Sequence, residues 1–201
     1  MSRFARNVTG GIALMLIFGG PAVMNADDID LSTWTAESYP AVASFPVGNW
    51  VVQPGNLSVV QTNNGQPTFF YSDFNAIGSS VIGSIRVIPG WDDDVIGFAL
   101  GFQPGDSSNA AADYLLIDWK KGNQGYDFLA PSCHPGGTAF AGLAVSRVTG
   151  IPTADEFWQH TDYSPGCGVQ NGGLQELARG NTLGSLGWEY DTTYEFTFEF
   201  T

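Results

Sequence analysis

Short apolar or alternating runs, separated by Gly, Pro, Asn and Asp, recur along most of this chain. Each run has the length and the β-branched and aromatic content of a strand, and helical periodicity is almost absent. Pro89-Gly90 and Pro104-Gly105 mark the clearest turns, because Pro fixes φ and Gly supplies positive φ. The expected strands are Trp50–Val52, 57–62, 68–71, 80–87, 96–102 and 114–119. The pattern predicts an all-β fold, an antiparallel β-sandwich of roughly ten strands.

The end of the chain, 194–201, alternates between aromatic and polar side chains. In a strand, alternate residues point to opposite faces of the sheet. One face is therefore expected to carry Tyr194, Phe196, Phe198 and Phe200. This pattern predicts a half-buried strand, with its aromatic face on the core.

Only 153–160 has helical character, with Thr153 as a candidate N-cap and two acids in the first turn. One or two turns are expected. The remainder of 123–163, and also 166–187, is rich in Gly and is expected to form long connections.

The N-terminus has the layout of a secretory signal peptide. Arg3 and Arg6 precede an apolar run at 11–18, which small and turn-forming residues close. We therefore expect a signal peptide at 1–26, cleaved after Ala26, followed by one sandwich domain at 27–201. A retained membrane anchor is the alternative.

The charge balance excludes several kinds of partner. The chain has 7 Lys and Arg against 20 Asp and Glu, a formal net charge of −13. Such a surface repels nucleic-acid phosphates and anionic lipids. We expect no nucleic-acid partner and no membrane insertion once the signal is removed, and divalent cations are the natural ligands.

Two cysteines, Cys133 and Cys167, lie outside the predicted signal peptide. After export they would meet an oxidising compartment, so a disulfide between them is expected. A zinc site formed with His134 and His160 is the alternative, although the paired spacing of structural zinc sites is missing.

Several sequence blocks, taken together, resemble the C-terminal lectin-like domain of thrombospondins. The most specific are Y-S-D-F-N-A at 71–76 and D-D-D-V-I-G-F-A-L-G-F-Q at 92–103. Further blocks lie at 49–52, 60–64, 114–120, 142–145, 158–161 and 186–188. The resemblance spans about 30–201, and it implies a concanavalin-like jelly roll, an extracellular location, calcium binding and an adhesive, non-enzymatic role. The expected partner is an extracellular protein or glycan surface.

The sequence also departs from that family. Gly65-Gln66 stands before Pro67, where the family has a cysteine and an aspartate, so the family's usual disulfide is absent. The family also continues beyond the point that corresponds to Thr201. The jelly roll is therefore expected to lack its last strands or to be closed differently, and thrombospondin partners are not carried over.

Three adjacent acids are the main candidate metal site. Asp92, Asp93 and Asp94 follow a turn, where carboxylates can converge on a cation that relieves their repulsion. Ca²⁺ takes six to eight oxygen ligands. The remaining ligands are expected from Asp73, Asn75 and Asp118. A solvated acidic turn is the alternative.

A carbohydrate-active protein is the rival class. Glu189 and Asp191 lie two residues apart as in jelly-roll glycosidases, but the third acid of that motif is missing. No G-x-S-x-G motif occurs, so a serine hydrolase is not indicated. For glycan binding, the aromatic candidates are Trp91, Trp158 and Trp188. Core filling is the alternative for each of them.

Overall fold

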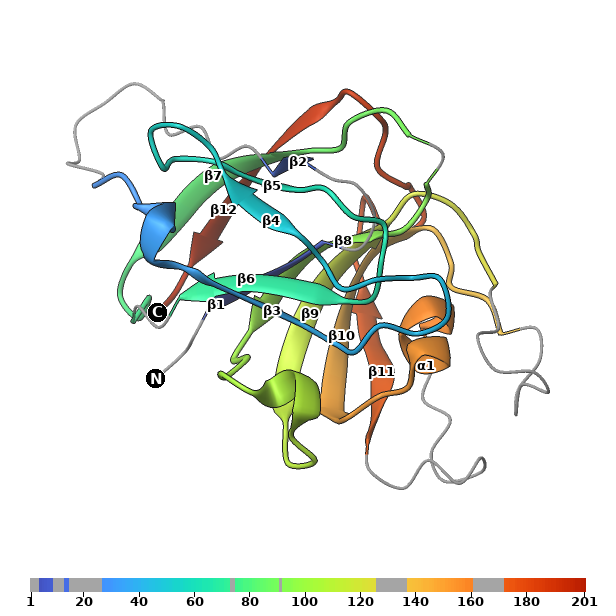
Figure 1. The fold of residues 1–201 in the computed structure, drawn as a ribbon. Helices are drawn as coiled ribbons and strands as arrows, with labels where there is room; N and C mark the ends of the chain where they lie inside the picture. Colours follow the sequence, from blue (N-terminus) through green and yellow to red (C-terminus); the bar gives the residue numbers. More distant parts are fainter. Residues whose placement is uncertain are drawn as a thin grey trace.

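The computed structural model describes residues 4–8, 13–14, 27–72, 75–90, 92–125, 137–160 and 172–201. Two antiparallel sheets, one of seven strands and one of five, pack face to face (Figure 1). The predicted all-β sandwich is confirmed. Among the described residues, no helix has the length and apolarity needed to cross a membrane.

The larger sheet is made of β11, β10, β9, β8, β1, β6 and β3, in this spatial order. Their bounds are Gly172–Arg179, Gly142–Gly150, Asp113–Lys120, Val95–Leu100, Phe4–Val8, Thr68–Ser72 and Thr35–Ser38. The smaller sheet has the order β12, β7, β2, β5 and β4. Their bounds are Thr193–Glu199, Ser80–Arg86, Ala13–Leu14, Val59–Gln61 and Trp50–Val52. The 3₁₀ turns η1 (Leu31–Thr33) and η2 (Asp106–Ser108) and the helix α1 (Ala154–Gln159) complete the described elements.

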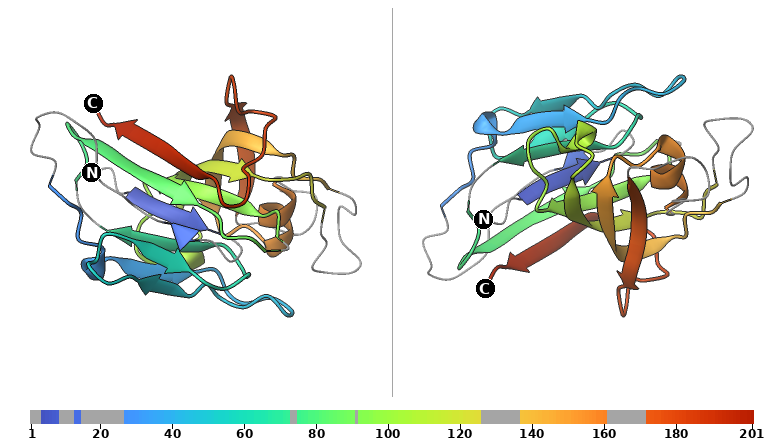
Figure 2. Two further views of the ribbon diagram at one scale, coloured as in Figure 1. Left: turned by 90° about the horizontal axis from the view of Figure 1, so that it is seen from above. Right: turned by 90° about the horizontal axis from the view of Figure 1, so that it is seen from below.

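The larger sheet is buried on both faces near its middle. In β6, Phe70 faces the smaller sheet, whereas Phe69 and Tyr71 belong to a second cluster with Phe157 of α1. Two buried faces require apolar residues at successive positions, which explains why the sequence of β6 is a continuous apolar run. The second cluster thus covers the face of the larger sheet that points away from the smaller one. Figure 2 shows the same ribbon from above and from below, coloured along the sequence.

The last strand, β12, forms an edge of the smaller sheet and pairs with β7 from Thr193 opposite Arg86 to Glu199 opposite Ser80. Its aromatic side chains are half-buried and its polar ones exposed, in strict alternation. Phe196 and Phe198 meet Phe98 of the larger sheet, with ring centroids 4.6 and 4.8 Å apart. The predicted half-buried strand is confirmed.

The expectation of long connections at 123–163 and 166–187 is wrong for β10 and β11. β10 pairs along its whole length with β9, and β11 pairs with β10 to form an edge of the larger sheet. The face of β10 that is most buried carries Ala144, Ser146 and Val148. Small residues there leave room for other groups to pack on the strand, but they also remove the bulky apolar alternation by which strands are recognised.

The predicted helix is confirmed as α1, which begins after Thr153 and covers part of β11. Thr153 Oγ1 accepts from the Glu156 backbone N–H at 3.2 Å, and Glu156 Oε2 accepts from the Thr153 N–H at 2.7 Å. This capping box satisfies backbone donors at the start of the helix. His160 ends it in the left-handed conformation, with φ of 56°.

Residues 4–8 and 13–14 take part in the two sheets. β1 lies between β6 and β8 and is antiparallel to both, and β2 lies between β5 and β7. Removal of 1–26 as a signal peptide stays a prediction.

Candidate metal site

The carboxylates of Asp92, Asp93 and Asp94 converge just before β8. One ligand oxygen from each lies within 4.8 Å of the others. Asp94 is 4% exposed, and the other two are partly buried. Three negative charges are thus held close together and partly shielded from water.

Three side chains distant in sequence hold the three backbone carbonyls of this acidic loop. Tyr190 Oη donates to the Asp92 carbonyl. Lys120 Nζ donates to the Asp93 carbonyl at 2.9 Å, and Trp188 Nε1 donates to the Asp94 carbonyl at 2.9 Å. With its backbone fixed in this way, the loop presents its carboxylates without a further ordering cost, which is the condition for a preorganised site.

The segment that carries Trp188 and Tyr190 is itself fixed to the end of β9. Trp119 Nε1 donates to the Leu186 carbonyl at 2.6 Å. A Cβ placed on Gly187 would lie 1.8 Å from the Lys121 carbonyl oxygen, so only glycine fits there. The close approach brings Trp188, which is 1% exposed, under the acidic loop.

The electrostatics of the cluster favour a bound cation. Burial and the neighbouring charge of Asp92 raise the pKa of Asp94 well above its usual range. Asp92 Oδ2 and Asp94 Oδ2 are buried, and no hydrogen-bond partner reaches them from the described part of the chain. A buried carboxylate oxygen without a partner is costly, and a hard cation is the ligand that satisfies two of them at once.

Lys120 supplies one positive charge beside this cluster. Its Nζ lies 3.7 Å from Asp93 Oδ1, and it also donates to Gln124 Oε1 at 2.8 Å. Burial lowers the pKa of Lys120 despite the nearby acids. One ammonium balances one of the three carboxylates, so the cluster can still accept a divalent cation.

The other predicted ligands are placed differently. Asp73 lies outside the described residues. Asn75 is exposed, and its Oδ1 accepts from the Ile77 N–H at 3.1 Å, which forms a local turn. Asp118 is not part of the converging group, because it pairs with His160.

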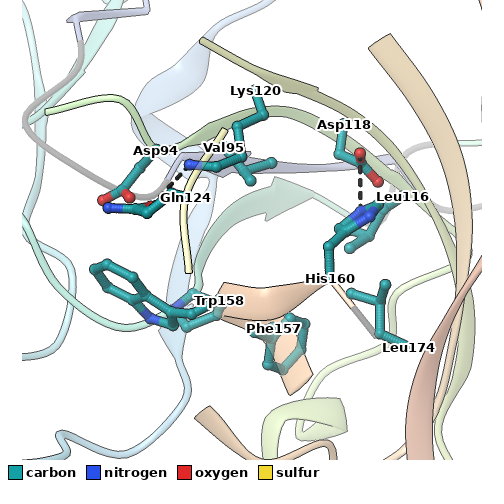
Figure 3. Close-up of a pocket in the computed structure, with 11 residues that line it drawn as sticks. Asp94, Val95, Leu116, Asp118, Lys120, Gln124, Phe157, Trp158, His160 and Leu174 are labelled. Atoms are coloured by element: carbon teal, nitrogen blue, oxygen red, sulfur yellow. Dashed lines mark hydrogen bonds and ion pairs between the residues drawn. The ribbon is translucent and has the colours of Figure 1, made fainter. Parts of the chain in front are cut away.

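Asp118 and His160 lie beside a small cavity beneath α1 (Figure 3). His160 Nε2 is 3.0 Å from Asp118 Oδ1 and 3.1 Å from Ser146 Oγ, and Glu176 Oε2 is 3.6 Å from Nδ1. Burial lowers the pKa of His160, but the Asp118 and Glu176 carboxylates outweigh that effect and the pKa is raised. The cavity has a volume of about 20 Å³, which is room for about one water molecule.

Two of the three tryptophans predicted to contact a glycan are buried. Trp158 is 8% exposed and packs edge-on against Phe45, with centroids 4.8 Å apart, and Trp188 is in the core. Neither offers an open ring face in this structure, so both match the core-filling alternative. Trp91 lies outside the described residues.

The two acids of the partial glycosidase motif are each paired with a base. Glu189 Oε2 is 2.8 Å from Lys121 Nζ, and Asp191 Oδ1 is 2.6 Å from Arg86. Cys133, Cys167 and His134 lie outside the described residues, so both the disulfide and the zinc alternative stay predictions.

Comparison with known proteins supports part of the resemblance. No family model matches the chain. The sequence is 36% identical over 80 residues to Thrombospondin-3b from Danio rerio, which is 39% of this chain and 8% of that protein. The chain therefore spans less than a tenth of this relative's length, and the match indicates a thrombospondin-like region.

Sequence reasoning found the acidic loop but missed the residues that hold it. Lys120 and Trp188 lie in the thrombospondin-like blocks at 114–120 and 186–188, and Tyr190 lies between the two acids of the partial glycosidase motif. A lysine directly after the apolar run at 114–117 and Trp119 is the available signal, since a buried lysine needs an acidic or carbonyl partner.

Proposed function

We propose that this protein is a secreted, calcium-binding recognition domain without catalytic activity. The observation that carries the proposal is the acidic loop at 92–94. Two of its buried carboxylate oxygens have no hydrogen-bond partner among the described residues, while all three of its carbonyls are held by other side chains. The partial similarity to a thrombospondin supports the extracellular location and the adhesive role.

The chemistry of the donors favours calcium over other divalent metals. The converging atoms are carboxylate oxygens, and no histidine or cysteine belongs to the converging group among the described residues. Hard oxygen donors suit Ca²⁺ and Mg²⁺, whereas zinc prefers nitrogen and sulfur. Ca²⁺ also accepts irregular geometry and carboxylates bound through one or both oxygens, which a loop of adjacent acids can offer.

Calcium would act here by making the surface more rigid, and it would take no part in a catalysed reaction. The loop joins the start of β8 to Lys120 on β9 and to the segment at 186–190. A cation that neutralises the loop would lock these three parts together. We propose that the resulting surface recognises an extracellular protein or glycan. EDTA, which removes calcium, should abolish binding of the domain to that partner.

The proposal is tested by unfolding the protein in calcium and in EDTA. Binding to the folded state alone raises the free energy of unfolding by about 2.7 kcal/mol when calcium is a hundredfold above Kd. We expect this increase for the wild type and its loss in an Asp92→Asn/Asp94→Asn variant. Magnesium should give a smaller increase, because it demands near-ideal octahedral geometry.

The matched control is Glu195→Gln/Glu199→Gln on the exposed face of β12. Like the Asp92→Asn/Asp94→Asn variant, it removes two negative charges, but at positions far from the loop in sequence. It should keep the calcium-dependent increase in the free energy of unfolding. An unchanged unfolding curve for folded wild-type protein in calcium and EDTA would contradict the proposal. An equal loss in both variants would show that calcium acts only on net charge.

A further inference from the structure

A second, larger cavity lies at the start of α1. Its walls come from the segment 39–42 after β3, from Gln66 shortly before β6, and from the segment that runs from the end of β10 into α1. Its volume is about 320 Å³, which is at the lower end of the range of ligand pockets in proteins, roughly 300–1,000 Å³. The described walls contain no residue of the acidic loop, so this cavity is separate from the candidate metal site.

The walls of this cavity are mostly apolar. They include the side chains of Pro40, Val42, Ile151, Pro152 and Phe157. At about 30 Å³ per water molecule, the cavity has room for on the order of ten waters. An apolar molecule that displaced these waters would be stabilised by the hydrophobic effect, because its own surface and that of the walls would both leave water.

The walls are fixed by contacts within the protein. Tyr39 Oη lies 3.1 Å from Tyr114 Oη, and the Tyr39 ring packs edge-on against Phe157 with centroids 4.7 Å apart. A Cβ placed on Gly65 would lie 2.1 Å from the Pro46 carbonyl oxygen, so the chain just before β6 is packed tightly at this point. A ligand would therefore enter a preformed site, and the cost of ordering the protein would be small.

One polar group of the wall has no partner. Gln66 is 1% exposed, and its Nε2 is buried without a hydrogen-bond partner among the described residues. A buried donor without an acceptor is destabilising, and native proteins seldom keep one. An oxygen acceptor on a ligand in the cavity would satisfy this amide.

The charges around the cavity restrict the kind of acceptor. Among the described residues that line it there is no Lys, Arg or His, whereas Asp155 is one of them. A carboxylate or phosphate would thus lose its hydration without gaining a counter-charge, which is costly. An ammonium group has donors and no acceptor, so it would leave Gln66 Nε2 unsatisfied. The acceptor that fits is a neutral oxygen, such as a carbonyl.

We propose that this cavity binds an uncharged, largely apolar small molecule that carries a carbonyl-type oxygen. Gln66 Nε2 donates to that oxygen, and the proline and aromatic walls hold the apolar part of the molecule. Because the acidic loop takes no part, binding does not require calcium.

The test uses the full chain in EDTA and a set of matched probes. Benzophenone has a carbonyl between its aromatic rings, diphenylmethane has the same rings without the oxygen, and diphenylacetate adds a carboxylate. Affinities are measured by ligand-observed NMR. Benzophenone should bind about two- to tenfold more tightly than diphenylmethane, the factor expected for one neutral hydrogen bond. Diphenylacetate should bind at least about tenfold more weakly than benzophenone, because its charge would be buried without a partner.

Three variants locate the site. Gln66→Leu removes the donor but keeps an apolar side chain, and it should remove the preference for benzophenone over diphenylmethane. Ala154→Trp places an indole at the wall of the cavity and should abolish the binding of both neutral probes. Ala110→Trp is the control at an exposed position outside the described walls, and it should bind both probes like the wild type. Thermal unfolding shows whether each variant is folded.

Photolabelling gives a readout that needs no variant. Irradiated benzophenone bonds covalently to nearby C–H groups, and mass spectrometry of the wild type should find the label in 39–42 and 151–157. Absence of saturable benzophenone binding to folded wild-type protein would overturn the proposal. So would equal affinities of the wild type for benzophenone and diphenylmethane, since Gln66 would then not select the ligand. Labelling only outside these two segments would mean that the probe binds elsewhere.

Discussion

Asp94 and Asp118 are equally buried but lie in opposite electrostatic surroundings. Each is 4% exposed, each lines the small cavity beneath α1, and each has an Oδ2 atom that no described residue contacts by a hydrogen bond. Asp94 lies beside two other acids, whereas Asp118 lies 3.0 Å from His160. The comparison teaches that burial alone does not decide what a carboxylate does, because its nearest charges decide whether it needs an outside cation.

The difference arises from where the neighbours come from. The acids around Asp94 are adjacent in sequence, so their repulsion is built into the loop. The partner of Asp118 is brought to β9 by α1, whose end places His160 against β9 and β10 (Figure 3). Asp118 thus faces a single basic partner from the chain, whereas Asp94 shares the one ammonium of Lys120 with two other carboxylates, which leaves the cluster with excess negative charge.

The largest expected effect comes from breaking the internal pair. Asp118→Asn leaves His160 buried without its closest carboxylate, and removal of one partner of a buried pair costs about 3–5 kcal/mol. Urea unfolding in EDTA should show this loss. The control Asp113→Asn removes the exposed partner of Arg147 and should change stability little, because exposed pairs are screened by water. Equal effects of the two substitutions would contradict the buried role of Asp118.

A smaller effect is expected from loosening the acidic loop. Trp188→Phe removes the indole donor to the Asp94 carbonyl, which should cost about 1–3 kcal/mol, because a buried acceptor loses its partner. It should also weaken calcium binding, measured by isothermal titration calorimetry.

Trp119→Phe is the matched control for that variant. Trp119 donates to the Leu186 carbonyl rather than to the acidic loop. The Trp119→Phe variant should lower the free energy of unfolding by about as much as Trp188→Phe does. Its calcium affinity should be closer to that of the wild type. If both variants lost affinity equally, the contact with Asp94 would have no special role.

The smallest expected effect is a pH dependence that separates the two carboxylate environments. The raised pKa values of His160 and Asp94 mean that the folded protein holds protons more tightly than the unfolded chain, so stability falls as pH rises. The His160 contribution is complete below the unfolded pKa of 6.5 and is lost as pH rises through the raised folded value. The Asp94 loss begins above the unfolded pKa of 3.8.

Urea unfolding between pH 4 and 9, in EDTA, would resolve the two contributions. His160→Gln should flatten the upper part of the profile, and Asp94→Asn should flatten the lower part. Saturating calcium should reverse the sign of the Asp94 contribution, since the metal binds the ionised carboxylate. A profile that neither variant changes would contradict both pKa directions.

Much of the fold could be predicted from the sequence. A strand with one buried face alternates between apolar and polar residues, and a strand with two buried faces is a continuous apolar run. Trp50–Val52, Thr68–Ser72, Asp113–Lys120 and the aromatic alternation of Thr193–Glu199 were recognisable for this reason. β10 and β11 were not, because Ala144, Ser146 and the glycines at 172–173 lack the bulk that marks a strand.

The candidate site was predictable only in part. Asp92, Asp93 and Asp94 stand together in the sequence, and their mutual repulsion is local. The residues that hold the loop lie 27, 94 and 98 positions away, so no local pattern connects them to it. Asp118 was also predicted as a calcium ligand. Its actual partner, His160, is 42 positions away, so no local pattern indicates the pairing.

The sequence by itself determined the strand periodicity, the strong negative charge and the cluster of three acids, since all of these depend on residues close together in the chain. Only the tertiary structure decided which carboxylates are buried, which cation faces each of them and which strand edges meet. Those properties depend on the distance between side chains and on exclusion of water, and both are set when distant segments pack together.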